Sequence, residues 1–370
     1  RTEIMSGDGP DLYIVNCRKG LNNREPLFPV PEKAMTGGLF LSLDDYIDNA
    51  QFMEWDKHTK AIMDAGRDEY GQQIVPMAYT LPLTFYRTAD VPDVKPDADT
   101  SWQDMLADES GVLKAATAWR HDEIAESRFA DYSDNYLEYI LGNLANFEND
   151  ELLVTQEELL ERVTEVIEID KACDSGEASE TPPHYQTCMY VGFDYGPRLD
   201  GQPYTSIEPR SWLPESYRGI HFNDPQTMIP IYSDDGGVTA TVTGFMAIDA
   251  NTDRAEDAFF LLDFIMSREW QRKNVLYAHY EKEAGGIPVH EDLMQRTCPI
   301  FARSQFYLLD ENYAEYSRVR EQINRVYFQG TFTDIFDDMY WECRSAYDRG
   351  EDLMPIVEEY YTQLKILMAE

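Results

Sequence analysis

The chain is short of positive charge. Only 31 of its 370 residues are Lys or Arg, against 69 Asp and Glu, which gives a net charge of −38. Such a surplus repels nucleic-acid phosphates and anionic membrane surfaces, so we exclude nucleic acid as a partner. Two interpretations of the surplus stay open: an adaptation for solubility and salt tolerance, or a preference for cationic ligands.

Cysteine is also scarce. Five cysteines are scattered along the chain, with no CxxC pair and no Cys/His spacing typical of zinc, which excludes a disulfide scaffold and a zinc finger. Cys173 and Cys188 flank a polar loop, and two interpretations stay open for them: a disulfide that closes the loop, or free buried thiols.

Long apolar runs and catalytic motifs are missing. The most apolar stretch, residues 259–266, is interrupted by Asp263, and no run is long enough to cross a bilayer. The sequence has no GxSxG, P-loop, HExxH or GxGxxG motif, and we predict neither an enzyme nor a cofactor or metal site. With 69 acidic residues, the pairs Asp234–Asp235 and Asp337–Asp338 arise by chance and are poor evidence for acid–base catalysis.

What is present predicts an α/β protein with buried cores, because strand-like and helix-like segments alternate and hydrophobic residues make up 43% of the chain. Residues 11–15 form a nearly continuous apolar run, which favours a parallel strand buried on both faces. Residues 100–103 and 155–158 have the spacing of helix capping boxes, and apolar stripes predict helices over 255–270 and 353–367. Residues 174–235 are rich in loop-forming residues.

Several segments together resemble the extracellular solute-binding proteins of the carbohydrate-uptake class, the group that includes maltodextrin-binding proteins. The similar segments, in order, are EIMSGDGPDL (3–12), GLFLSLDDYI (38–47), GQQIVP (71–76), LTFY (83–86), TSW (100–102), GFMAI (244–248) with the helix that follows, GIPV (286–289), and MYW (339–341) with the final helix. Gln72 replaces a usual Lys, and residues 174–235 match poorly.

The resemblance implies a two-lobed, hinge-linked fold of the periplasmic-binding-protein type II, with a ligand cleft between the lobes. It places residues 1–87 and 245–300 in lobe one and residues 88–244 and 301–370 in lobe two. It also implies a monomeric receptor that captures a sugar or oligosaccharide and delivers it to the permease subunits of an ABC transporter. Such a receptor lies at the extracellular face of the membrane, lipid-anchored or periplasmic.

The chain start carries a further expectation. Residues 1–5 are typical of the end of a helix rather than of a natural beginning, and the resemblance places two strands of lobe one upstream. We therefore expect an additional N-terminal segment with an export signal. The strand at residues 12–15 then has either an open groove beside it or another segment in its place.

Aromatic and polar residues near the expected cleft are the candidate ligand contacts. Trp341 aligns with an aromatic position that faces the cleft in sugar-binding relatives, and Arg344 lies one turn later. Stacking of C–H faces on aromatic rings suits sugars, which makes the loop residues Trp212 and Tyr195 further candidates. Tyr79 near the first crossover and Asn16 at a strand end complete the set. For each, core packing or pairing with an acid stays open as the alternative.

Other functions remain as alternatives. The same scaffold also suits a cationic small molecule such as a polyamine, which the negative charge favours. A sensory ligand-binding protein is a second alternative. A glycoside hydrolase with two carboxylates is disfavoured, since close acidic pairs are uninformative in so acidic a chain.

Overall fold

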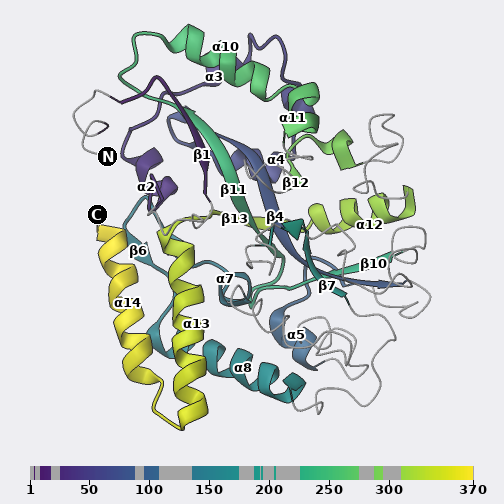
Figure 1. The fold of residues 1–370 in the computed structure, drawn as a ribbon, viewed down its shortest axis with the longest axis vertical. Helices are drawn as coiled ribbons and strands as arrows, with labels where there is room; N and C mark the ends of the chain where they lie inside the picture. The colour runs from purple at the N-terminus through teal and green to yellow at the C-terminus, as the bar shows by residue number, and fades with distance from the viewer. Residues whose placement is uncertain are drawn as a thin grey trace.

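The computed structural model describes residues 4, 9–17, 26–87, 96–107, 136–174, 187–191, 193–194, 204–205, 226–274, 287–294 and 310–369. They form a mixed α/β molecule around a seven-stranded sheet (Figure 1). The strands of this sheet are β1 (Leu12–Asn16), β4 (Ile74–Arg87), β7 (Thr187–Val191), β10 (Gln226–Pro230), β11 (Val238–Ile248), β12 (Ile287–Pro288) and β13 (Ile323–Phe328).

Three short antiparallel strand pairs and the helices surround this sheet. The pairs are β2 (Arg67–Asp68) with β3 (Gly71–Gln72), β5 (Ala145–Asn146) with β6 (Glu151–Leu152), and β8 (Phe193–Asp194) with β9 (Tyr204–Thr205). The helices are α2 (Pro31–Thr36), α3 (Asp44–Ile47), α4 (Lys60–Asp64), α5 (Trp102–Ala107), α7 (Tyr136–Ile140), α8 (Gln156–Asp174), α10 (Ala255–Ile265), α11 (Arg268–Asn274), α12 (Asp310–Arg320), α13 (Thr331–Arg349) and α14 (Met354–Ala369). Two 3-10 helices span Trp55–Lys57 and Glu291–Met294.

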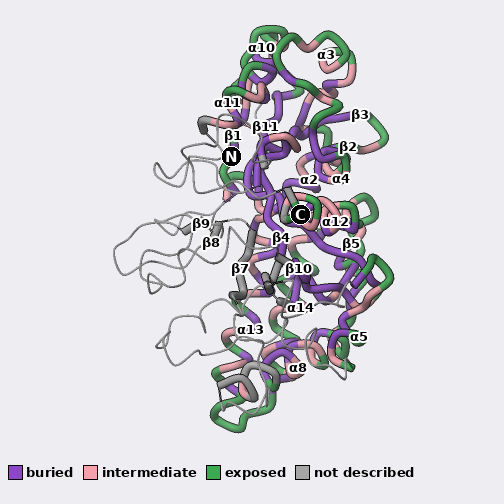
Figure 2. Tube along the Cα trace, turned by 90° about the vertical axis from the view of Figure 1, so that its right-hand side faces the viewer, coloured by how far each residue is buried: buried purple, intermediate pink, exposed green. Residues whose placement is uncertain are grey.

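Two long strands run through the whole molecule. β4 has 14 residues and pairs antiparallel with β11, whose 11 residues are all buried. Figure 2 shows the buried positions following these strands through the middle of the molecule, while exposed positions gather on outer helices such as α8 and α10. A β-bulge between Gly244 and Phe245 shifts the register of the pair and bends it locally.

The buried side chains form two separate cores. The first lies around β1, β4 and β11 and includes edge-to-face contacts of Phe28 with Tyr13 and Phe40, at ring distances of 5.3 and 5.2 Å. The second lies among α7, α8, α13 and α14. Residues 310–328, which the sequence analysis assigned to lobe two, contribute Tyr316 and Val319 to the first core. The lobe boundaries themselves stay a prediction.

Strand β1 differs from the strand predicted at residues 11–15. It pairs antiparallel with β11 and has only one buried face, because Tyr13 and Val15 point into the first core while Ile14 is 54% exposed. The apolar run is therefore not that of a parallel strand covered on both faces. Among the described residues β1 has β11 as its single neighbour. The expected upstream strand stays a prediction.

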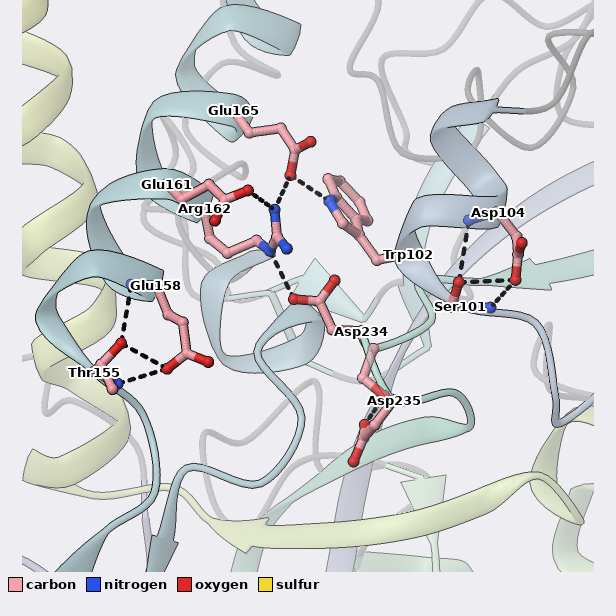
Figure 3. Close-up of polar contacts among 11 residues, drawn as sticks. Ser101, Trp102, Asp104, Thr155, Glu158, Glu161, Arg162, Glu165, Asp234 and Asp235 are labelled. Carbon is pink, nitrogen blue, oxygen red and sulfur yellow. Dashed lines mark hydrogen bonds and ion pairs between the residues drawn. The ribbon is translucent and has the colours of Figure 1, made fainter.

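The local helix predictions are confirmed, with adjusted ends. Both Thr155 and Ser101 cap their helices with the acid three residues later: Glu158 accepts hydrogen bonds from the Thr155 amide and hydroxyl at 2.7 and 2.8 Å, and Asp104 does the same for Ser101 (Figure 3). The capping box at 100–103 is thus shifted by one residue. The helix predicted over 255–270 is divided into α10 and α11, with the break at residues 266–267.

A buried carboxylate fastens a loop to α10. Asp263 is 2% exposed and accepts the backbone N–H groups of Gln51, Phe52 and Met53, at 2.7 to 3.1 Å. These bonds keep the charge satisfied inside the protein, and they hold the Phe52 ring edge-to-face against Phe260 at 5.5 Å.

Replacement of Asp263 by Asn tests this fastening. An amide offers one acceptor and places N–H donors against the loop, so we expect Asp263→Asn to lower the free energy of unfolding by about 3 kcal/mol, as measured by urea denaturation. Glu256→Gln changes an exposed acid on the same helix and is the matched control, with a change below about 0.5 kcal/mol. Equal effects of the two variants would contradict the role of Asp263.

Two buried histidines lie side by side, one before β4 in the chain and one just after β12. The rings of His58 and His290 are 5.6 Å apart, and the side chains are 4% and 0% exposed. Burial, reinforced by the neighbouring His290, lowers the pKa of His58 from 6.5 to about 4. The folded protein therefore keeps His58 neutral at pH values where the unfolded chain protonates it.

This difference predicts a loss of stability in mild acid. The contribution of neutral, buried His58 to the free energy of unfolding is fully present above pH 6.5 and is lost as the pH falls towards 4. The loss amounts to about 2 kcal/mol between pH 7 and pH 5. Between pH 7 and pH 5, we expect the free energy of unfolding, measured by urea denaturation, to fall by about 2 kcal/mol more for the wild type than for His58→Phe. Glu32, whose pKa burial raises to about 7, acts in the opposite direction but is common to both proteins. Parallel pH profiles would contradict the assignment.

Candidate ligand-binding site

A row of threonines on β11 forms one wall of the candidate site. Thr239, Thr241 and Thr243 alternate along the strand, so their side chains share one face of the sheet, and all three are at most 4% exposed. Thr80 of the adjacent β4 is 6% exposed, and its hydroxyl donates to the Thr241 carbonyl at 3.4 Å. Buried hydroxyls need hydrogen-bond partners: Arg325 of β13 donates to Thr239, and helix α7 supplies partners for Thr241 and Thr80.

Helix α7 places an acid and a phenol against this wall. Glu138 is 4% exposed, and its Oε1 accepts a 3.0 Å hydrogen bond from the Thr241 hydroxyl. Burial raises the pKa of Tyr139 well above its ordinary value, and the charge of Glu138 adds to this, while hydrogen bonds with Thr241 and Thr80 act the other way. We call Thr80, Glu138, Tyr139 and Thr241 the polar cluster.

Two predicted residues lie on helix α13, which also contacts α7. Trp341 and Arg344 are half-buried and stand one turn apart, so they share a face of the helix. The Trp341 ring lies 5.3 Å from that of Tyr340 at an interplanar angle of 74°, and Arg344 Nη1 donates to the Tyr340 hydroxyl at 3.0 Å. Trp341 also packs against the second core. Asp337 of the same helix raises the pKa of Tyr139, which links α13 to the polar cluster electrostatically.

Asn16 and Tyr79 lie at nearly the same position along the sheet, on strands β1 and β4, which flank β11. Gly244 of β11 lies opposite Asn16 on one side and Ala78 on the other, so β1 and β4 carry the two predicted residues at neighbouring positions. Asn16 is exposed at the end of its strand. Tyr79 is 0% exposed, belongs to the first core and shares a hydrogen bond with the hydroxyl of Tyr316. Its packing gives it a structural role, the alternative that the sequence left open.

Trp212 and Tyr195 lie outside the described residues, so the structure does not relate them to the polar cluster. The side chains of Cys173 and Cys188 lie outside them too. Cys17 and Cys343 are buried free thiols.

The polar cluster was not predicted from the sequence, although the sequence contains two signals of it. Glu138 is the single charged residue in the apolar run at 136–141, and threonines recur with period two at 239, 241 and 243. An acid inside an apolar helix and hydroxyls on a buried strand both predict polar groups that meet in the interior.

The acidic pair Asp234–Asp235 is used for structure. Arg162 Nε donates to Asp234 Oδ2 at 2.6 Å and its Nη1 to Glu165 at 3.1 Å, and Glu165 also accepts the indole N–H of Trp102 at 2.7 Å (Figure 3). Asp235 pairs with Arg325 at 2.7 Å. These bonds join α5 and α8 to the turn that precedes β11.

Two other features concern the described part of the chain: clusters of metal ligands and helices that could span a membrane. No three His, Cys, Asp or Glu side chains there lie close enough together to hold a metal ion. Within the same residues, none of the helices has the length and apolar character that crossing a membrane requires.

Comparison with solved structures decides the fold. An extracellular solute-binding protein of family 1 from Alicyclobacillus acidocaldarius is similar at a TM-score of 0.55 and 13% identity, over 100% of this chain and 86% of that one. The fold is that of the extracellular solute-binding proteins. A periplasmic oligogalacturonide-binding protein from Yersinia enterocolitica (TM-score 0.53, 12% identity, 99% and 88% coverage) agrees with this.

A solute-binding protein of an ABC transporter from Agrobacterium radiobacter, in complex with ribitol, is similar to the same degree, with a TM-score of 0.53, 12% identity and coverage of 99% and 87%. A de novo designed esterase also matches, at a TM-score of 0.51 and 12% identity over 99% and 86% of the two chains. No family model and no curated protein matches the sequence. The likeness to known proteins thus rests on three-dimensional structure.

Proposed function

We propose that the protein is a solute-binding receptor that closes around a sugar or oligosaccharide. The observation that carries the proposal is the polar cluster, because it brings polar side chains of separate elements together: Thr80 and Thr241 come from the long strands, and Glu138 and Tyr139 from α7. A concave site with a few converging polar groups and an aromatic wall is what a saccharide needs.

In this proposal each group has a role in binding. The face of Trp341 stacks on the C–H face of a sugar ring, and Arg344 donates to hydroxyls. Glu138 accepts from a hydroxyl of the ligand. Ligand that touches both halves favours the closed arrangement, since binding shifts a hinge equilibrium by its differential affinity for the two states.

The proposed receptor works outside the cell and without catalysis. The similar binding proteins are extracellular or periplasmic, which supports a place at the outer face of the membrane, lipid-anchored or periplasmic. The partners in this proposal are the permease subunits of an ABC transporter, to which a monomeric receptor delivers its ligand. We do not propose hydrolysis: Asp234 and Asp235 are each held in an ion pair.

A cationic ligand is the second candidate, and one observation favours it. Glu138 is buried in the polar cluster, and Asp337 acts on the same Tyr139 ring. A carboxylate in a protected site attracts an ammonium group more strongly than a hydroxyl, and the net charge of −38 favours the approach of cations.

The role of Trp341 is tested by its replacement with Ala. If the ring stacks on ligand, Trp341→Ala weakens binding by about 1–3 kcal/mol, which is the usual scale for losing a central aromatic contact. Tyr347→Ala, an exposed aromatic residue on the same helix, is the control and leaves affinity unchanged. Calorimetry with a ligand found by thermal-shift screening of a saccharide panel measures both. Unchanged affinity together with a lower free energy of unfolding would show that Trp341 serves core packing and does not contact the ligand.

Glu138→Gln separates the two ligand classes. The amide keeps size and one acceptor but removes the charge, so we expect saccharide affinity to fall about tenfold and polyamine affinity about a hundredfold or more. The measurement is calorimetry with the best saccharide and with spermidine on both proteins. Binding of neither class to wild type would contradict the proposed function.

A further inference from the structure

A cavity of about 600 Å³ lies where the two cores meet, and it shares no lining residue with the polar cluster. One wall consists of residues 27–30 and α2. The other consists of the β5–β6 hairpin and the end of α14. Figure 1 shows α2 close to β6 and to the C-terminal end of α14. The volume is within the range of pockets that hold small molecules.

The lining is mainly apolar and comes from both cores. Phe28 belongs to the first core and Val30 to the second, while Phe147 and Leu367 pack against the second. Phe147 is anchored from behind by Phe332, at a ring distance of 5.2 Å. The cavity walls thus come from both cores, and neither core alone encloses the space.

Charge at the rim determines which ligand suits the cavity. Lys33 is the single basic residue of the lining, and it is already engaged: its ammonium group pairs with Asp150 and donates to the Met368 carbonyl at 2.8 Å. This pair offsets the charge of Asp150, and Glu148 adds a second carboxylate to the lining, so the local balance is negative by one charge. Phe28 and Phe147 supply aromatic surface for the apolar body of a ligand.

We propose that this cavity is a second ligand site, specific for a small amine with an apolar, ring-containing body. The body fills the space between Phe28 and Phe147, and the ammonium group lies at the rim beside Glu148. The site is independent of the proposed saccharide site, because none of its lining residues belongs to the polar cluster or is among the predicted sugar contacts.

Three probes of one shape and different charge test the assignment on the full chain. They are tryptamine (cation), tryptophol (neutral) and indole-3-propionate (anion), titrated by calorimetry at pH 7 in 150 mM salt. We expect saturable binding of tryptamine, three- to tenfold weaker binding of tryptophol, and no saturable binding of indole-3-propionate. Failure of all three to bind, or tightest binding of the anion, would overturn the proposal.

Variants locate the site. Leu27 lines the cavity and is 40% exposed, so Leu27→Trp fills it from the open side, and we expect tryptamine affinity to fall at least tenfold. Leu153→Trp changes a leucine of similar exposure, 46%, outside the lining, and keeps wild-type affinity. Thermal unfolding of both variants verifies folding. Equal affinity of the three proteins would place the amine elsewhere and overturn the proposal.

A charge variant that preserves the cavity gives an independent test. Glu148 is exposed and lines the cavity, so Glu148→Gln removes one carboxylate charge and leaves the Lys33–Asp150 pair in place. We expect tryptamine affinity to fall about fivefold and tryptophol affinity to stay unchanged. A fall for both probes, or for neither, would contradict the role of the rim charge. This variant lies outside the proposed saccharide site, so the result does not depend on that function.

Discussion

The antiparallel pairing of β4 with β11 is the interaction on which the rest of the structure depends. Each remaining strand of the described seven-stranded sheet pairs with one of these two: β1 and β13 with β11, and β7, β10 and β12 with β4. All 11 residues of β11 are buried, so this strand is covered on both faces along its length. Both strands contribute side chains to the first core, and the Glu138–Thr241 hydrogen bond joins β11 to α7 of the second core, so a change in their register would disturb both.

This constraint also explains where the candidate ligand site lies. A strand that is buried throughout has to satisfy every polar side chain that it carries, and β11 carries three threonines on one face. α7 satisfies the middle one through Glu138, at the cost of burying an acid. The paired hydroxyl and carboxylate are the polar groups that the proposed receptor would offer to its ligand.

Sequence reasoning succeeded where the information is local. The capping box at Thr155 and the stripe of α14 depend on residues a few positions apart, and both are confirmed. It failed where the deciding contact is distant. The apolar run of β1 does not contain the information that its partner lies 236 residues away and runs antiparallel, nor that Ile14 stays uncovered in this structure. The polar cluster was missed for the same reason, since Glu138 and Thr241 are 103 residues apart.

The negative charge has a use that neither interpretation from composition anticipated. Several acids are buried and serve as acceptors that join distant segments: Asp263 binds a loop 210 to 212 residues away, Asp249 accepts from Tyr13, and Glu32 accepts from the Phe328 amide at 2.9 Å. Each has a defined donor, as a buried acid requires. Glu138 belongs to the same class by burial, yet it differs in facing the hydroxyl wall of the candidate site. Glu138 likewise joins α7 to β11 across 103 residues, so folding accounts for its burial, and a ligand contact is the added role that we propose for it.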